Sequence, residues 1–179
     1  HLPHHLSLPF AETKARAAAR RDLGLPEEAL IVCAPGLATT AKGLDAALLA
    51  LGALRQRHPR LLFVVAGDGD RGRILEEARA AGMEGAVRCT GRLSLPDFAR
   101  HLCAADVVLN LRFPTHGEIS GALVRALGLG RPVLVTAGTP ATDEFPEGVV
   151  VPVDPGPGQE AELRALLDLL LEDAPLRER

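Results

Sequence analysis

The amino-acid sequence predicts an α/β fold: a doubly wound, six-stranded parallel sheet of the Rossmann type. Two observations support this prediction. Short, wholly apolar runs such as residues 29–34 (ALIVCA) and 61–66 (LLFVVA) have the length and composition of strands buried on both faces. They alternate with segments in helical spacing, such as residues 43–57, where leucines fall on one stripe. Strands that alternate with helices form right-handed β-α-β units, which build a sheet covered by helices on both faces.

The elements follow one another in a regular order along the chain. Residues 1–28 are expected to hold an extended N-terminal segment and a helix over residues 12–22, which are rich in Ala, Arg and Lys. Residues 29–179 are expected to form the Rossmann-like domain, in which Ser94 caps a helix. Each strand is an apolar run of four to six residues, and each helix is the stretch in helical spacing that follows one. The strands are expected at residues 29–34, 61–66, 86–89, 107–111, 132–136 and 149–153, and the helices at residues 43–57, 71–81, 95–104, 119–129 and 159–171.

Composition and charge exclude several classes of protein. Hydrophobic residues make up 47% and charged residues 24% of the 179 residues, as in a globular domain. Aromatic residues amount to 3% and the net charge is −3, which argues against proteins that stack bases or attract nucleic acid with a basic field. No apolar run approaches the ~20 residues of a membrane-spanning helix, and the N-terminus lacks the pattern of a signal peptide.

Cysteine and histidine positions give little sign of a disulfide framework or a metal site. Cys33, Cys89 and Cys103 are odd in number and form no C-x-x-C pair, so we expect reduced, buried thiols in a cytoplasmic protein. The three histidines at the N-terminus are either metal ligands or a tag remnant. His101 is expected on the solvated side of its helix, and for His116 a catalytic role is the less favoured alternative. Basic residues are almost all arginine, a bias typical of GC-rich bacterial genes.

Ligands of a doubly wound sheet bind at the carboxyl ends of its strands, so the loops there are the candidate sites. The loop over residues 35–43 carries Lys42 to the start of a helix, where backbone N–H groups and an ammonium attract an anion. The alternative is an ordinary loop with an exposed lysine. Residues 67–72 match G-x-G-x-x-G, but they follow the second strand and no acidic residue clearly ends the next one, so a tight turn is favoured.

The loop over residues 111–121 is the third candidate site. Glu118 stands where a helix is expected to begin and where free backbone N–H groups point outward. Arg125 is the single charge of that apolar helix and shares a face with Glu118 at helical spacing. A buried arginine needs a partner, either the phosphate or carboxylate of a ligand or an internal ion pair with Asp143 or Glu144. For Glu118 the alternative is a helix cap.

The ordered set of motifs resembles the C-terminal domain of the retaining, nucleotide-sugar-dependent glycosyltransferases of the GT-B fold, of the family 4 type. The likeness runs over nearly the whole chain, and it depends on the spacing of six loops rather than on any single motif. The matching segments are residues 4–9 (HHLSLP), 21–26 (RDLGLP), Gly36, 42–43 (KG), 62–69 (LFVVAGDG), 87–93 (VRCTGRL), 105–109 (ADVVL) and 130–134 (GRPVL).

The resemblance implies a donor site built from these loops. Lys42 would contact the donor diphosphate, as would the backbone N–H groups at the helix start, and Glu118 would contact the donor sugar. The loop after the third strand would hold the nucleobase through its backbone. The implied donor-binding residues are Gly36, Lys42, Gly91, Arg92, Leu93, Arg112, Glu118, Ile119, Ser120, Gly121 and Arg125, with Lys42 and Glu118 as the catalytic members.

The chain departs from the family pattern at three positions. Leu37 stands where an arginine commonly follows the first-loop glycine, and Arg125 takes the place of a second glutamate, which binds the ribose in the family. Glu118 itself comes one residue later than usual. One phosphate cation and one ribose carboxylate are therefore missing, and Arg112 and Arg125 are the cations available to compensate.

The resemblance further implies an enzyme that transfers a sugar, with retention at the anomeric carbon, from a nucleoside diphosphate sugar to an acceptor. The acceptor would be bound by an N-terminal Rossmann domain of the same protein, so this chain alone is expected to be inactive, in the cytoplasm or at the inner face of the membrane. No cofactor or metal is expected, because Asp68 and Asp70 lie in a turn and not as a D-x-D motif at a strand end. The alternatives are a degenerate, non-catalytic module that binds a nucleotide sugar or acts as a scaffold, and half of a GT-B sugar-nucleotide epimerase. A dehydrogenase is disfavoured because the glycine pattern follows the wrong strand.

Overall fold

The computed structural model describes residues 16–115 and 117–177, and it contains the predicted six-stranded sheet. The strands are β1 (Leu30–Pro35), β2 (Leu61–Ala66), β3 (Val87–Cys89), β4 (Val107–Asn110), β5 (Val133–Thr136) and β6 (Val151–Val153). All neighbouring strands are parallel, and their order is β3-β2-β1-β4-β5-β6. The order reverses between β1 and β4, which makes the sheet doubly wound and confirms the predicted fold class.

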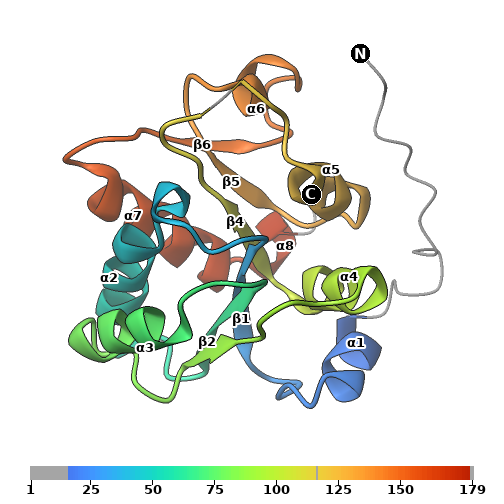
Figure 1. Cartoon of the computed structure of the whole chain (residues 1–179), viewed down its shortest axis with the longest axis vertical. Helices are drawn as coiled ribbons and strands as arrows, with labels where there is room; N and C mark the ends of the chain where they lie inside the picture. The colour runs from blue at the N-terminus through green and yellow to red at the C-terminus, as the bar shows by residue number, and fades with distance from the viewer. Residues whose placement is uncertain (1–15, 116, 178–179) are drawn as a thin grey trace.

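Helices cover both faces of this sheet (Figure 1). They are α1 (Arg16–Asp22), α2 (Leu44–Leu54), α3 (Arg71–Ala80), α4 (Leu95–Ala104), α5 (Gly121–Gly128), α6 (Pro140–Asp143), α7 (Gln159–Glu172) and α8 (Ala174–Arg177), with a 3-10 turn, η2 (Thr40–Lys42), before α2. One face of the sheet packs against α2, α3 and α7, and the other against α1, α4 and α5. No described helix combines the length and the apolar character needed to cross a bilayer.

Neighbouring strand residues contribute to two different cores. Along β2, Phe63 and Val65 belong to the core under α2, α3 and α7, whereas Val64 and Ala66 belong to the core under α1, α4 and α5. All six residues of β2 are buried. Each large apolar side chain that is fully buried stabilises the fold by roughly 1.5–3 kcal/mol. A strand buried on both faces therefore has no polar side, which explains its wholly apolar sequence.

Several element ends differ from the sequence-based expectation. The helix expected from residue 119 begins only at Gly121, because Ser120 keeps an extended backbone and its Oγ accepts a hydrogen bond from the N–H of Ala122. The predicted cap Ser94 is confirmed, since its Oγ accepts from the N–H of Asp97. Residues 149 and 150 precede β6 and are not part of it. The short helices α6 and α8 were not expected, because four residues are too few to show helical periodicity.

The prediction for His101 is wrong. The residue is only 9% exposed, and its Nδ1 lies 2.8 Å from the carbonyl oxygen of Asp97 in the preceding turn of α4. Its position on the helix face predicted contact with solvent, but α1 packs against α4, and Arg20 donates to the carbonyl oxygen of Ala104 at this end of the helix. Of the three cysteines, Cys33 and Cys103 are buried and Cys89 is partly exposed, and none forms a disulfide with another described residue. The predictions for the N-terminal histidines, for His116 and for residues 12–15 concern positions outside the described residues.

A buried ion pair joins α1 to the sheet. Nη2 of Arg20 lies 2.7 Å from Oδ2 of Asp106, and both side chains are nearly inaccessible. The same carboxylate accepts a hydrogen bond from the N–H of Ile31 at 2.7 Å, and its other oxygen lies 2.6 Å from Nη1 of Arg16. Because each buried charge is paired and hydrogen-bonded, the network fixes α1 at the amino ends of β1 and β4.

Candidate functional site

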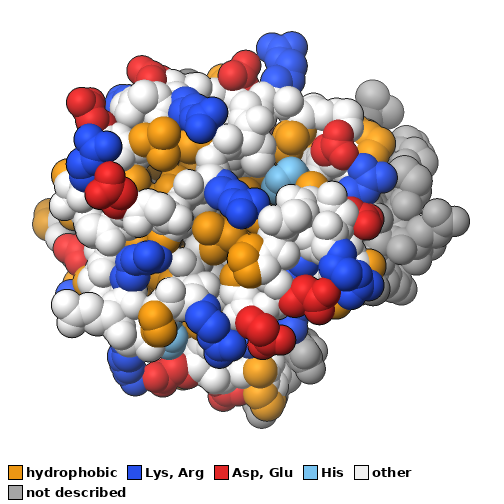
Figure 2. Space-filling view, turned by 90° about the horizontal axis from the view of Figure 1, so that it is seen from below, with side chains coloured by type: hydrophobic (Ala, Val, Ile, Leu, Met, Phe, Trp, Pro, Cys, Tyr) orange, Lys and Arg blue, Asp and Glu red, His pale blue; other side chains and the backbone are white. Residues whose placement is uncertain are grey.

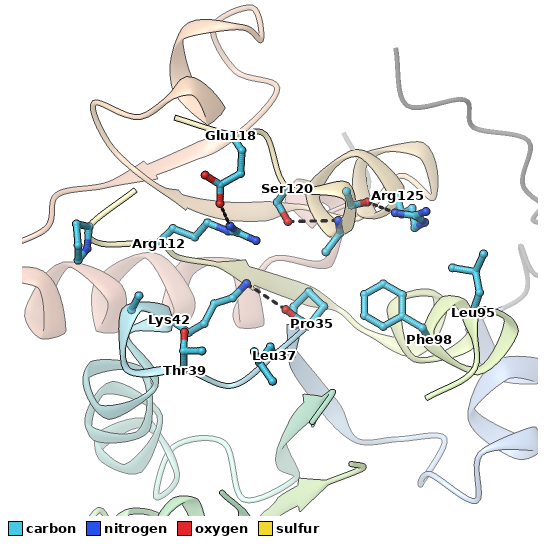
Figure 3. A pocket seen from close by; sticks show the side chains of 15 residues that line it. Pro35, Leu37, Thr39, Lys42, Leu95, Phe98, Arg112, Glu118, Ser120 and Arg125 are labelled. Atoms are coloured by element: carbon cyan, nitrogen blue, oxygen red, sulfur yellow. Dashed lines mark hydrogen bonds and ion pairs between the residues drawn. The ribbon is translucent and has the colours of Figure 1, made fainter. Parts of the chain in front are cut away.

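A cavity of about 540 Å³ opens between the loops that follow β1 and β4. This is the point at which the strand order reverses, where ligands of doubly wound sheets bind. We call it the switch-point cavity. Figure 3 shows the side chains that line it. They are Pro35, Gly36, Leu37, Thr39, Ala41, Lys42, Leu95, Phe98, Arg112, Pro114, Glu118, Ser120, Gly121, Ala122 and Arg125.

The loop after β1 places Lys42 inside this cavity. Gly43 adopts a left-handed conformation with φ of 58°, which ends the 3-10 turn and lets α2 begin directly after the lysine. Nζ of Lys42 donates a hydrogen bond to the carbonyl oxygen of Pro35 at 3.3 Å and lies over Gly36. Burial, together with the positive charge of Arg112, lowers the pKa of Lys42 to about 8, although Glu118 acts in the opposite direction. The alternative of an exposed lysine is therefore wrong.

The loop after β4 supplies a second cation and a carboxylate. Arg112 forms an ion pair with Glu118 through Nη1, and its backbone N–H donates to Oγ1 of Thr136 at 2.8 Å, which ties the loop to β5. Nε of Arg112 is buried and has no hydrogen-bond partner among the described residues. In Figure 3 the charged ends of Lys42, Arg112 and Glu118 point toward one another. Glu118 pairs with Arg112 and does not act as the cap of α5, which is Ser120.

The first turn of α5 forms another wall of the cavity. The Ser120 side chain satisfies one backbone N–H, and the N–H groups of Gly121 and Leu123 have no partner among the described residues. Arg125 donates from Nη1 to the carbonyl oxygen of Gly121 at 2.8 Å, and its buried Nε has no partner within the described part of the chain. No ion pair joins Arg125 to the described acidic residues, so the predicted pair with Asp143 or Glu144 does not form.

A smaller cavity of about 390 Å³ adjoins the first. The two share Gly36, Leu37, Leu95 and Phe98, so together they form one elongated cleft. We call the smaller one the side cavity. Its far wall is the loop after β3, with Arg92 and Leu93, and the turn after β2.

The cleft gathers most of the residues that the sequence analysis proposed. Seven of them line the switch-point cavity: Gly36, Lys42, Arg112, Glu118, Ser120, Gly121 and Arg125. Arg92 and Leu93 line the side cavity, whereas Gly91 and Ile119 line neither, and Ile119 packs against the core beneath α5. Sequence reasoning missed Leu95 and Phe98, which form the apolar wall. The signal that could have found them is their place in the first turn of a helix that begins at the carboxyl end of the sheet.

The glycine-rich turn after β2 has a packing role. A Cβ at Gly67 would lie 2.1 Å from the carbonyl oxygen of Gly36, so only glycine lets the loops after β1 and β2 approach this closely. Oδ1 of Asp68 accepts from the N–H of Gly69, and Oδ1 of Asp70 accepts from the N–H of Arg73 as the cap of α3. Both carboxylates therefore serve the turn, as the sequence indicated.

The arrangement suits an elongated anionic ligand. Lys42, Arg112 and Arg125 face a single carboxylate among the described lining residues, and the open helix start adds backbone donors. A phosphate group accepts several such charge-assisted hydrogen bonds at once. The apolar wall of Leu95 and Phe98 runs along both cavities and can contact a less polar part of the same ligand.

Comparison with known proteins agrees with this geometry. The family described as "Glycosyl transferases group 1" matches residues 28–173. The chain is 33% identical over 153 residues to the D-inositol 3-phosphate glycosyltransferase of Saccharomonospora viridis, a match that covers 77% of this chain and 35% of that protein. The chain thus spans about a third of the length of this curated relative.

Solved structures show the same fold. HepE of Anabaena, in complex with UDP and glucose, superposes with a TM-score of 0.74 at 22% identity, over 91% of this chain and 44% of that one. The C-terminal domain of the group 1 glycosyl transferase LpcC of Francisella tularensis has a TM-score of 0.74 at 18% identity, over 92% of this chain and 86% of that one. The chain therefore belongs to the group 1 glycosyltransferases, and its sheet is that of the C-terminal Rossmann-like domain of a GT-B fold.

Proposed function

We propose that this chain binds the donor of a retaining glycosyltransferase, a nucleoside diphosphate sugar. The observation that carries the proposal is the convergence of Lys42, Arg112 and the open start of α5 on one cavity at the switch point of the sheet. A diphosphate placed there would take hydrogen bonds from both cations and from the N–H groups of Gly121 and Leu123.

The same groups would assist the reaction. As the bond between the sugar and the diphosphate lengthens, negative charge grows on the leaving group. Cations and N–H dipoles that are already in position stabilise that charge without reorganising, and partial burial strengthens each interaction. In this proposal they take the role that a metal ion has in other transferases, since Asp68 and Asp70 are engaged by the backbone of their turn.

The shape of the cleft indicates where the sugar, the ribose and the nucleobase of the donor would lie. Glu118 would release Arg112 to the diphosphate and accept hydrogen bonds from hydroxyl groups of the sugar. Arg125 would face the ribose, and the nucleobase would enter the side cavity next to Arg92 and Leu93, against backbone groups of the loop that Gly91 begins.

We further propose that the acceptor is held by a second Rossmann-like domain, N-terminal in the same protein. The match to only about a third of the curated relative supports this, as does the 44% coverage of HepE. The chain alone would then bind donor without transferring the sugar. Transfer of sugar by this chain, with no other polypeptide present, would contradict the proposal.

Calorimetric titration of the chain with UDP, GDP and ADP tests donor binding, and the complex of HepE with UDP makes UDP the first choice. We expect one site for at least one nucleotide, and a loss of about tenfold or more in affinity for Lys42→Ala. Lys14→Ala is the matched control, because Lys14 and Lys42 are the two lysines of the sequence. Absence of binding for all three nucleotides would favour a non-catalytic scaffold, and unchanged affinity of Lys42→Ala would remove the role given to that residue.

A further inference from the structure

A third cavity, of about 330 Å³, lies on the open edge of the sheet beside β3. We call it the edge cavity. None of its described lining residues lines the switch-point or the side cavity. Figure 2 views the molecule from the side of α1 and α3, where basic side chains stand between apolar ones. The lining residues are Leu23, Leu25, Val64, Arg71, Leu75, Val87, Arg88, Cys89, Thr90 and His101.

The edge cavity has cationic side chains and no opposing charge. The guanidinium groups of Arg71 and Arg88 supply the positive charge, and none of the described lining residues is acidic. The other arginines of α3 are neutralised, because Arg73 pairs with Glu77 and Arg79 with Glu84. Arg71, in contrast, forms no hydrogen bond or ion pair through its guanidinium with any described residue. Its charge acts to lower the pKa of the Cys89 thiol, against the larger effect of burial, which places the guanidinium near β3.

His101 adds a buried polar group to the same cavity. With 9% of its surface exposed, the ring is held by the hydrogen bond between Nδ1 and the carbonyl oxygen of Asp97. A carbonyl oxygen only accepts, so Nδ1 carries a proton, and Nε2 is the nitrogen left for a ligand. In the neutral ring Nε2 accepts, so its partner would be the P–OH group of a singly ionised phosphomonoester. Arg88 donates from Nη1 to the carbonyl oxygen of Gly24 at 3.1 Å, which holds its side chain along the cavity wall.

The edge of β3 contributes backbone donors. In the ladder between β2 and β3, the N–H of Phe63 donates to the carbonyl of Ala86 and the N–H of Thr90 donates to the carbonyl of Val65. Backbone groups of parallel strands alternate in direction, so the N–H and carbonyl groups of Val87 and Cys89 point away from the sheet. Both residues line the edge cavity, where these N–H groups are available to a ligand.

We propose that the edge cavity is a second anion site, which binds a phosphomonoester with a small apolar or sugar-sized body. The two guanidinium groups of Arg71 and Arg88 and the buried imidazole of His101 line the cavity and would contact the phosphate. The leucines at positions 23, 25 and 75 form the wall for the organic part. A cavity of this volume is larger than a bare phosphate needs, which is why the ligand carries a body. The alternative is that the arginines only shield an exposed strand edge from other chains.

Titration with butyl phosphate, followed by the backbone amide signals in ¹H–¹⁵N spectra, tests this site separately from the donor site. Saturable shifts at Cys89 and Thr90 are expected, and butanol should cause none. Arg71→Ala and Arg88→Ala should each weaken binding at these signals about tenfold. Arg79→Ala removes the same charge from α3 outside the cavity and should change the affinity less than twofold.

Two further experiments distinguish a lipid from a free metabolite as the source of the phosphate, and binding at the edge cavity from binding at the donor site. Vesicles of phosphatidylcholine with phosphatidic acid present the same phosphomonoester on a lipid. If the protein sediments with these vesicles and Arg71→Ala abolishes the sedimentation, the source of the phosphate is a lipid. Binding of butyl phosphate without vesicle binding identifies a free metabolite. Lys42→Ala should leave the Cys89 and Thr90 shifts unchanged, so a failure of donor binding would not affect the result. Absence of both kinds of binding, or equal binding by Arg71→Ala and Arg79→Ala, would refute the second site.

Discussion

Nucleotide affinity should fall as the pH rises from 7 to 9, because Lys42 loses its proton in this range. The size of the effect follows from the pKa of Lys42, which burial and Arg112 lower to about 8 in the ligand-free protein. A bound diphosphate holds the ammonium form, so affinity decreases by the factor 1 + 10^(pH − pKa). This factor is about 1.1 at pH 7 and about 11 at pH 9, which predicts a loss of about tenfold. A lysine at its ordinary pKa would lose less than about 1.1-fold.

Calorimetric titration with UDP at pH 7 and pH 9 measures this difference, and Lys42→Arg provides the control. A guanidinium stays charged throughout the range, so the variant should lose the part of the pH dependence that Lys42 causes. Loss of a proton from the nucleobase would change the affinity of both proteins equally, so it cancels when the wild type is compared with Lys42→Arg. Equal affinity of the wild type at the two pH values would refute the reasoning, as would the same pH dependence in Lys42→Arg.

The ligand-free protein should respond to pH with the opposite sign. The unfolded chain keeps the Lys42 proton up to about pH 10.5, whereas the folded chain keeps it only up to about pH 8. Between these values the unfolded state binds more protons, so the contribution of Lys42 to the free energy of unfolding rises with pH. Urea unfolding at pH 8 and pH 10, compared between the wild type and Lys42→Arg, isolates this contribution.

Two predictions concern packing. Asp106→Ala should lower the free energy of unfolding by about 3–5 kcal/mol in urea titrations, because it leaves the buried guanidinium of Arg20 without its partner; a loss below 1 kcal/mol would show that water reaches the pair. Gly67→Ala should weaken UDP binding at least about tenfold, since its Cβ would lie 2.1 Å from the carbonyl oxygen of Gly36 and must displace the loop after β1. Gly72→Ala, five residues further along the chain at the start of α3, is the matched control and should leave UDP affinity unchanged, because its Cβ meets nothing closer than 3.4 Å. Equal UDP affinity of the two glycine variants would contradict the role given to Gly67.

The fold was predictable because its evidence is local. Residues 61–66 form a strand with the expected bounds, since a wholly apolar run this short, between two segments in helical spacing, is typical of a buried parallel strand. Ser94 was recognisable as a cap because its hydroxyl and the N–H it satisfies lie three residues apart. The order of strands and helices then limited the topology to a doubly wound sheet. This topology in turn predicts the edge of the sheet at which ligands bind.

Contacts between distant segments were not predictable from these patterns. Helical spacing placed Arg125 and Glu118 on one face, but Glu118 pairs with Arg112 and Arg125 donates to the backbone of its own helix. His101 is buried for a similar reason, because the chain that covers it lies about eighty residues earlier in the sequence. Periodicity describes how one segment turns about its own axis, and it does not say which other segment lies beside it.

The sequence by itself determined the sheet, the loops that meet at its carboxyl edge and the lysine that one of them carries. Only the tertiary structure decided the chemistry of that lysine. Its pKa depends on burial and on Arg112, which belongs to a loop about seventy residues away. It also decided that the glycine-rich turn packs against the first loop and that two arginines and a buried histidine share one cavity at the edge of the sheet. Electrostatic interaction depends on distance in space and on exclusion of water, and the fold sets both.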